Sequence, residues 1–176
     1  MTRTILETLP LENGDCLTRG EFERRYQTLP FLKKAELIEG VVYMSSPVRV
    51  SHGESPAHLL GWLYTYLMAT PGISLADNTT VRLDADNEPQ PDALLRIQVG
   101  GQSRISGDGY IEGAPELMAE VAGSSASLDL RDKLRVYRRN QVQEYLVWRV
   151  YEGEMKLFFR FFSGFLTAFF VSLDGA

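Results

Sequence analysis

The chain has 176 residues, 44% of them hydrophobic and 23% charged, which fits a single globular domain with a sizeable core. Its 18 basic and 23 acidic residues give a formal charge of −5, which does not by itself indicate a nucleic-acid binder but leaves room for a local basic patch. With Cys16 as the only cysteine and two histidines, neither an intrachain disulfide nor a zinc site is expected, and any metal should be a hard cation held by carboxylates.

The N-terminal part of the chain predicts a short helix and then a hairpin. Residues 17–29 have an amphipathic pattern, with Thr18 as the N-cap and Glu21 at the capping-box spacing. Residues 35–46 are rich in strand formers on both sides of a Glu39-Gly40 turn, which predicts a β-hairpin.

The next segment, 51–70, has the clearest helical pattern in the chain. Ser51 and Glu54 have the capping-box spacing, Pro56 falls within the first turn, and leucines recur at helical intervals until Pro71 ends the segment. Beyond it the pattern predicts strands over 79–84, 91–97, 116–122 and 144–153, a mobile glycine-rich loop over 100–109 and a helix over 127–140.

The C-terminal stretch 158–170, FFRFFSGFLTAFF, is very hydrophobic, but it is shorter than the ~20 residues that a membrane-spanning helix needs, and Arg160 interrupts it. We therefore expect a strand or hairpin that closes the core, and no membrane association. Residues 1–17 carry acids and lack a continuous apolar stretch, so no secretory signal is expected, and one cysteine fits a reducing cytoplasm.

The order of the predicted elements indicates an α/β (α+β) fold, in which helices pack on one central mixed β-sheet. No internal repeat or linker divides the chain, so we expect one domain over 1–176. It would comprise an N-terminal helical segment, 1–35, core motifs over about 36–150, and an aromatic-rich segment, 151–176.

Two acids stand on short apolar strands. Asp92 begins one strand and Glu120 lies inside the next, where alternation puts it on the same face as Met118 and Ala122. Each acid alone could simply face water. Strands that follow each other in the sequence are neighbours about two-thirds of the time, so the two carboxylates could also meet on one face. Paired carboxylates repel unless a cation lies between them, which favours a divalent metal.

The helix over 127–140 adds a lysine. Helical spacing directs Leu134, Tyr137 and Gln141 toward the sheet and puts Lys133 at the edge of that face. Lys133 either covers the core edge with its methylenes or lies beside the carboxylates, where it could orient a water or hold a phosphate. A separate face of this predicted helix either is simply solvated or binds along the phosphates of a nucleic acid. That face carries Arg131, Arg135, Arg138 and Arg139.

At these residues the chain resembles the Uma-type putative restriction endonuclease family, a branch of the PD-(D/E)XK nuclease superfamily. The resemblance covers about two-thirds of the chain. Each matching piece is weak alone, but their order and spacing together are specific. The pieces are ELIEG (36–40), SHGESPAHLLGWL (51–63), QPDALL (90–95), ELMAEVAGSSASLDLRDKLRVY (116–137) and VQEYLVW (142–148).

The resemblance implies a restriction-endonuclease-like core and assigns Asp92 as the motif aspartate and Glu120 as the acid of the second half-motif. The usual pattern has a lysine at position 122, where this chain has Ala122. The family commonly moves the lysine to the following helix, which here makes it Lys133.

The resemblance also assigns Glu36 as a third acid near the metal, with Glu39 as a substitute. His52 matches a histidine common in the family, and it is either catalytic or simply a polar residue at a helix end. The chain departs from the family at 122–127, AGSSAS, where a Ser-Pro-Ser is frequent, and in its short aromatic end.

These assignments predict an Mg²⁺- or Mn²⁺-dependent endodeoxyribonuclease. Asp92 and Glu120 would hold the metal with Glu36 and a backbone carbonyl, that of Val121, while Lys133 positions the attacking hydroxide. DNA is the expected partner, and a homodimer or higher homo-oligomer is plausible because cutting both strands needs two sites.

Two rivals remain open. A module that kept the nuclease fold without cutting, as a DNA-binding or scaffold domain, fits the charge of −5. A carboxylate-pair glycosidase would need neither metal nor lysine. A serine hydrolase fits less well, because GSSAS at 123–127 is not a nucleophile elbow.

Overall fold

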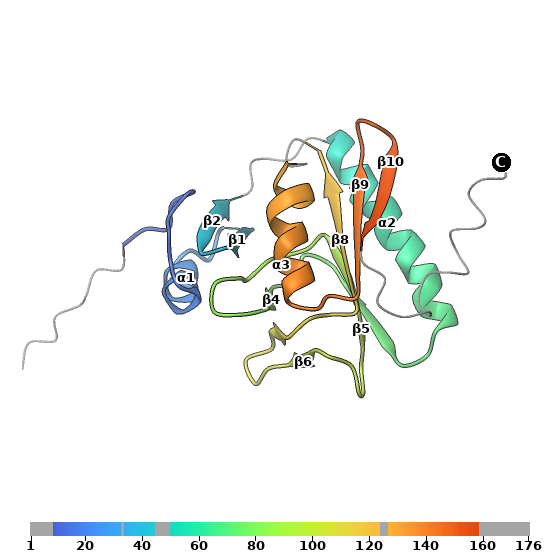
Figure 1. The fold of residues 1–176 in the computed structure, drawn as a ribbon, viewed down its shortest axis with the longest axis horizontal. Coiled ribbons are helices and arrows are strands. Elements are labelled where there is room, and N and C mark those ends of the chain that lie inside the picture. The colour runs from blue at the N-terminus through green and yellow to red at the C-terminus, as the bar shows by residue number, and fades with distance from the viewer. Residues whose placement is uncertain (1–8, 33, 45–49, 124–126, 159–176) are drawn as a thin grey trace, which may run out of the picture.

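The computed structural model describes residues 9–32, 34–44, 50–123 and 127–158. Its centre is a five-stranded sheet in the order β10-β9-β8-β5-β3, in which β8 and β9 are parallel and the other neighbours antiparallel. The expected mixed sheet flanked by helices is therefore confirmed (Figure 1). The strands are β3 (Ile73–Ala76), β5 (Ala93–Ile97), β8 (Leu117–Ala122), β9 (Glu144–Arg149) and β10 (Glu154–Phe158).

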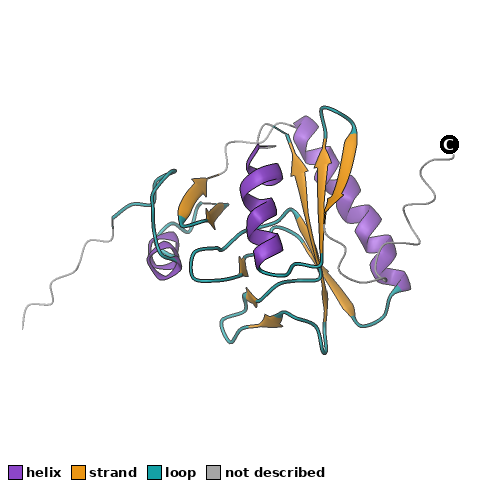
Figure 2. Ribbon diagram, in the orientation of Figure 1, coloured by secondary structure: helices purple, strands orange, loops and turns teal. Residues whose placement is uncertain are grey.

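Two helical segments lie on opposite sides of this sheet (Figure 2). On one side, α2 (Val50–Ala69) packs Leu59 and Leu63 against Leu117 and Ala119 of β8. On the other, a π-helical turn, η1 (Leu128–Lys133), continues into α3 (Leu134–Arg139), and the helix buries its apolar side chains against Met118 and Ala122. The predicted alternation of β8 between two apolar layers is thus confirmed, and it puts Glu120 beneath α3.

The N-terminal elements form a smaller unit beside the main sheet. Helix α1 (Arg19–Tyr26) begins after the N-cap Thr18, as predicted, and the hairpin follows as β1 (Ala35–Ile38) and β2 (Val41–Met44). The turn residues Glu39 and Gly40 have φ of 53° and 73°, as a tight hairpin turn requires. Backbone hydrogen bonds between Leu37 and Glu88 join β1 to the segment before β5.

The middle of the chain differs from the prediction in three places, the first of which is β3, an edge strand of the main sheet that was not predicted. The strand expected over 79–84 is only β4 (Val81–Arg82). The glycine-rich loop over 100–109 is not irregular throughout, because β6 (Arg104–Ile105) pairs with β7 (Ile111–Glu112), and β7 also pairs with β4. This three-stranded sheet depends on contacts between distant segments, which local patterns do not record.

Two helix predictions also need correction. Val50 already lies in α2, so Ser51 is inside the helix rather than its N-cap, and Pro56 lies beyond the first turn. In the second helix, the wider π-helical turn rotates Lys133 from the expected edge to the interior, where it is 2% exposed. Gln141, expected to face inward, is exposed because it follows the end of α3 in a left-handed conformation, with φ of 63°.

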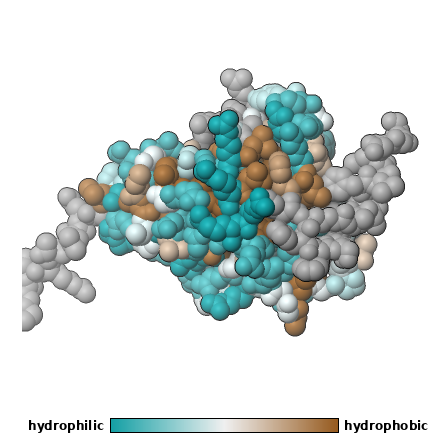
Figure 3. Space-filling view, in the orientation of Figure 1, coloured by the Kyte–Doolittle hydropathy of each residue, from teal (hydrophilic) through white to brown (hydrophobic). Residues whose placement is uncertain are grey.

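Strand β10 begins the aromatic C-terminal segment, and the ring of Phe158 lies 6.1 Å from that of Tyr145. The rest of the segment, 159–176, falls outside the described residues. No described helix is both long and apolar enough to cross a membrane. The face of the molecule seen in Figure 3 is mostly hydrophilic, including the surface over α3. That surface carries the four exposed arginines predicted there, Arg131, Arg135, Arg138 and Arg139.

Candidate active site

Glu120 and Asp92 are brought together by the pairing of two neighbouring strands. In the antiparallel register of β5 with β8, Ala93 is opposite Ala119. Asp92, just before β5, therefore lies across from Glu120. Glu120 is 3% exposed, so it is a buried acid and not a surface residue. The prediction that the two strands are neighbours is confirmed.

Lys133 lies at the centre of a buried group that we call the acid–lysine cluster: Glu36, Glu120, Asp129 and Lys133. Its Nζ is 2.8 Å from Glu120 Oε1, 2.9 Å from Glu36 Oε1 and 3.5 Å from Asp129 Oδ1. The Tyr137 hydroxyl donates to the same Glu120 oxygen at 3.1 Å. These side chains come from β1, β8, η1 and α3, so four separate elements fix the cluster.

Asp92 lies at the edge of this cluster, with its two oxygens engaged differently. Oδ2 accepts a hydrogen bond from the backbone N–H of Val121 at 2.8 Å, and Oδ1 lies 3.0 Å from the ammonium of Lys34. Lys34 and Glu36 are two residues apart at the start of β1, which directs both side chains to the same face. Glu36 is held in turn by the backbone N–H of Gln90, at 2.8 Å.

Burial and charge compete within the cluster. The pKa of Glu120 is raised to about 8, and burial is the largest cause. The neighbouring carboxylates Asp92 and Asp129 also raise this pKa, while Lys133 and Lys34 oppose the shift. Burial alone would lower the pKa of Lys133, but Glu120 and Glu36 outweigh it and hold that pKa well above its usual value. With several acids around one buried ammonium, the ammonium keeps its charge and one carboxyl retains a proton near neutral pH.

Comparison with known proteins identifies the family. Residues 20–164 match the model of the Uma2 family, described as "Putative restriction endonuclease". The chain belongs to this family. A crystal structure described as "a putative nuclease belonging to DUF820", from Anabaena variabilis, has a TM-score of 0.58 and 13% sequence identity, and the match covers 77% of this chain and 82% of that one. This likeness supports the nuclease fold. A search of curated proteins found no match.

For this Uma2 protein, reasoning from the sequence missed three members of the site: Lys34, Asp129 and Tyr137. Two of them had a signal in their spacing. Lys34 precedes Glu36 by two residues on a strand, and Asp129 precedes Lys133 by four on a helix. Tyr137 was expected to face the sheet, but nothing in its position indicated that its hydroxyl would reach Glu120.

The other predicted site residues divide into three cases. Glu36 contacts Lys133, whereas its substitute Glu39 lies at the hairpin turn and pairs with Arg139 at 3.0 Å. The N–H of Val121 faces Asp92, and in an extended strand the carbonyl of the same residue points to the same edge. His52 lies within α2, but its side chain falls outside what the structure describes.

The donor atoms suit a hard divalent cation, since Asp92, Glu120 and Glu36 offer carboxylate oxygens from three neighbouring elements. Across the described ranges, no three acid, histidine or cysteine side chains form a ready metal-binding group. The contacts explain why, because ammonium groups lie against the oxygens that a metal would use, Lys133 between Glu36 and Glu120 and Lys34 beside Asp92. Of the two ammonium groups, that of Lys34 lies at the more exposed edge, beside the Asp92 oxygen that a metal would use, whereas that of Lys133 is held in the interior.

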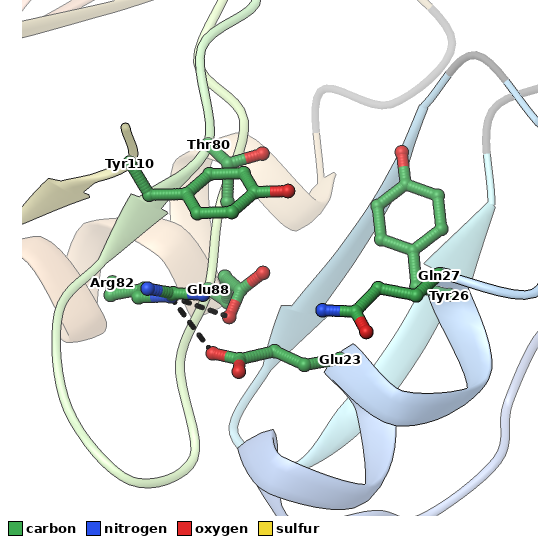
Figure 4. A pocket seen from close by; sticks show the side chains of 7 residues that line it. All are labelled: Glu23, Tyr26, Gln27, Thr80, Arg82, Glu88 and Tyr110. Atoms are coloured by element: carbon green, nitrogen blue, oxygen red, sulfur yellow. Dashed lines mark ion pairs between the residues drawn. The ribbon is translucent and has the colours of Figure 1, made fainter. Parts of the chain in front are cut away.

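A second charged group, centred on the buried Arg82, lies between α1 and the three-stranded sheet. We call it the arginine cluster: Arg82 with Glu23, Glu88, Asp108 and Glu112. Arg82 is 2.9 Å from both Glu23 and Asp108 and 4.0 Å from both Glu88 and Glu112, and its guanidinium lies 4.4 Å from the Tyr110 ring centre. Figure 4 shows Glu23 reaching from α1 toward Arg82 beside a cavity of about 30 Å³.

Proposed function

We propose that this protein is a metal-dependent endonuclease that hydrolyses DNA phosphodiester bonds. The observation that carries the proposal is the convergence of Glu120, Glu36 and Lys133, with Asp92 opposite Glu120, on one face of the central sheet. Three carboxylates beside a lysine can hold a divalent cation and still leave a positive group for the substrate. Membership of the Uma2 family supports the same function.

In this proposal, Asp92, Glu120 and Glu36, with the carbonyl of Val121, hold Mg²⁺ or Mn²⁺. A bound divalent ion lowers the pKa of a coordinated water and offsets charge on the scissile phosphate. Lys133 orients the attacking water and stabilises charge that develops on the phosphate. The new bond joins the water oxygen to phosphorus, the ester bond to one sugar breaks, and the leaving oxygen takes up a proton.

DNA binding would rely on a local positive surface, because the whole chain has a formal charge of −5. The exposed arginines of η1 and α3 are the candidates, but part of their charge is already offset. Arg139 pairs with Glu39 and Asp84, at 3.0 Å and 3.4 Å, and Arg135 pairs with Asp132 at 2.5 Å. A homodimer, which would supply a second site for the other strand, belongs to the same proposal.

One observation favours a second candidate, a nuclease fold that binds DNA or serves as a scaffold without cutting. Glu120 and Lys133 are only 3% and 2% exposed, so metal and substrate reach them only if the cluster opens. The lysine contact argues against the carboxylate-pair glycosidase, because Lys133 is the nearest cation to Glu120 and that chemistry has no use for it.

The proposed function is tested by incubating supercoiled plasmid with the wild-type protein and Mg²⁺. We expect nicked and linear products that EDTA abolishes, and no products from Asp92→Asn, which keeps an oxygen for the Val121 N–H but loses the charge. Asp108→Asn, in the arginine cluster, is the matched control and should cut like the wild type. Cleavage by Asp92→Asn at the wild-type rate contradicts the proposal, as does metal-independent cleavage.

A further inference from the structure

The ion pair between Lys34 and Asp92 is the more solvent-exposed part of a site that is otherwise buried. Both side chains are 19% exposed, whereas those of Lys133 and Glu120 are 2% and 3% exposed. Lys133 is held by several carboxylates in the interior and has little freedom to move. Lys34 is therefore the lysine of the site that solvent and a large substrate can reach.

The two residues of this ion pair are also held by other contacts. Strand β1 is already attached by the backbone hydrogen bonds between Leu37 and Glu88, and by that from Gln90 to Glu36. Asp92 is independently oriented by the N–H of Val121. Because these other contacts already fix both residues, the position of the Lys34 ammonium against a proposed metal ligand fits a further role.

The ion pair between Lys34 and Asp92 also affects where a metal could bind. Because Val121 engages Asp92 Oδ2, the oxygen that faces Lys34 is the one left for a cation. A divalent ion at that oxygen would repel the ammonium and displace it. A lysine carries its charge on a flexible four-carbon chain, and an ammonium is a common partner of phosphate groups.

We propose that Lys34 is a substrate-binding residue whose ammonium holds Asp92 in the metal-free protein and, when metal binds, moves to a phosphate oxygen of the DNA. This inference rests on the proposed function, and it adds a role for a residue outside the predicted site. It assigns the two lysines different tasks, with Lys133 beside the reacting phosphate and Lys34 on the substrate backbone. The contribution of Lys34 to DNA affinity should then depend on metal.

The test measures binding of a cleavage-resistant phosphorothioate duplex by fluorescence anisotropy over a range of salt concentrations, with and without Mn²⁺. With Mn²⁺, Lys34→Met should weaken binding several-fold, and the slope of log affinity against log salt should flatten by about 0.9, the value of one phosphate contact. Lys34→Arg should largely retain both values. Without Mn²⁺, Lys34→Met and the wild type should bind alike.

Arg104→Met is the control, because Arg104 also pairs with a carboxylate, Glu112, but lies on β6. It should bind DNA to the same extent as the wild type with and without Mn²⁺. If Mn²⁺ changes wild-type binding but Lys34→Met keeps the wild-type slope, the role of Lys34 is refuted while the proposed function stands. A loss of the same size with and without Mn²⁺ also refutes it. If Mn²⁺ leaves wild-type binding unchanged, both proposals fail together.

Discussion

The acid–lysine cluster and the arginine cluster both bury carboxyl groups, yet they are built differently. Each contains a glutamate with a pKa raised to about 8, chiefly by burial: Glu120 in the first and Glu88 in the second. Around Glu120 the opposing groups are lysines, and its Oε1 accepts from both Lys133 and Tyr137. For Glu88, the second largest influence on the pKa after burial is another acid, Glu23, which acts in the same direction as burial.

The polar atoms of the two clusters are also satisfied to different degrees. In the arginine cluster, Arg82 Nε and Glu23 Oε1 form an ion pair at 2.9 Å that lacks hydrogen-bond geometry. Glu88 Oε2 is also buried without a hydrogen bond, beside the small cavity of Figure 4. A cavity of about 30 Å³ has room for a water, which would supply those hydrogen bonds. The cluster ties α1 to the three-stranded sheet through a guanidinium that stays protonated. We infer that it is a structural joint, whereas the acid–lysine cluster has the groups needed for chemistry.

The largest expected contrast is in cleavage. Glu120→Gln should lower Mg²⁺-dependent plasmid cleavage on the order of 10³-fold, because it removes a metal-binding charge, while Glu88→Gln should stay within about twofold of wild type. Glu120 retains a proton near neutral pH, so its glutamine variant should unfold at nearly the wild-type denaturant concentration. If the two variants cleaved equally, the distinction between the clusters would be wrong.

The next contrast is in stability. Lys133→Met leaves Glu120, Glu36 and Asp129 buried without the ammonium at their centre, so it should lower the free energy of unfolding by about 3–5 kcal/mol. Arg104→Met, which breaks an exposed ion pair, should lower it by less than about 1 kcal/mol. Urea denaturation of both variants measures this. Equal midpoints would show that the lysine is not a structural centre.

The arginine cluster should respond to pH through Glu88. The pKa of Glu88 is about 8 in the folded protein against 4.5 for a solvent-exposed glutamate, so the folded state binds the proton more tightly. Stability from this group is complete below about pH 4.5 and is lost as pH rises toward 8, by at most about 1.4 kcal/mol per unit of pKa difference. Glu88→Gln should flatten that decline in thermal unfolding curves. An unchanged pH profile would exclude Glu88 as its source.

The smallest contrast concerns the arginine surface. Arg138→Ala should reduce the salt dependence of DNA binding by at most one phosphate contact, a slope change of about 0.9, without changing the rate of cleavage at saturating DNA. Anisotropy and cleavage assays together measure this. A large loss of cleavage at saturation would show instead that the arginine acts within the site.

The sequence alone predicted most of the main sheet, because alternation and apolar runs record how β5 and β8 bury their faces, but it missed the edge strand β3. It also predicted that Asp92, Glu120 and Lys133 come close together, and the strand pairing and the contact between Lys133 and Glu120 agree with that geometry. It did not predict how deeply Lys133 is buried, since a π-helical turn rather than regular spacing sets its direction. The arginine cluster was not predicted either, because Glu23, Arg82 and Asp108 meet only through contacts between distant segments.

The central claim is that Asp92 and Glu120 form a metal site, and isothermal titration of Mn²⁺ into the metal-free protein tests it most directly. The wild type should bind Mn²⁺ with release of a proton, and more tightly as pH approaches 8, because Glu120 must ionise to bind. Glu120→Gln should bind far more weakly, and Glu88→Gln should match the wild type. No binding by the wild type, or equal binding by Glu120→Gln, would contradict the account.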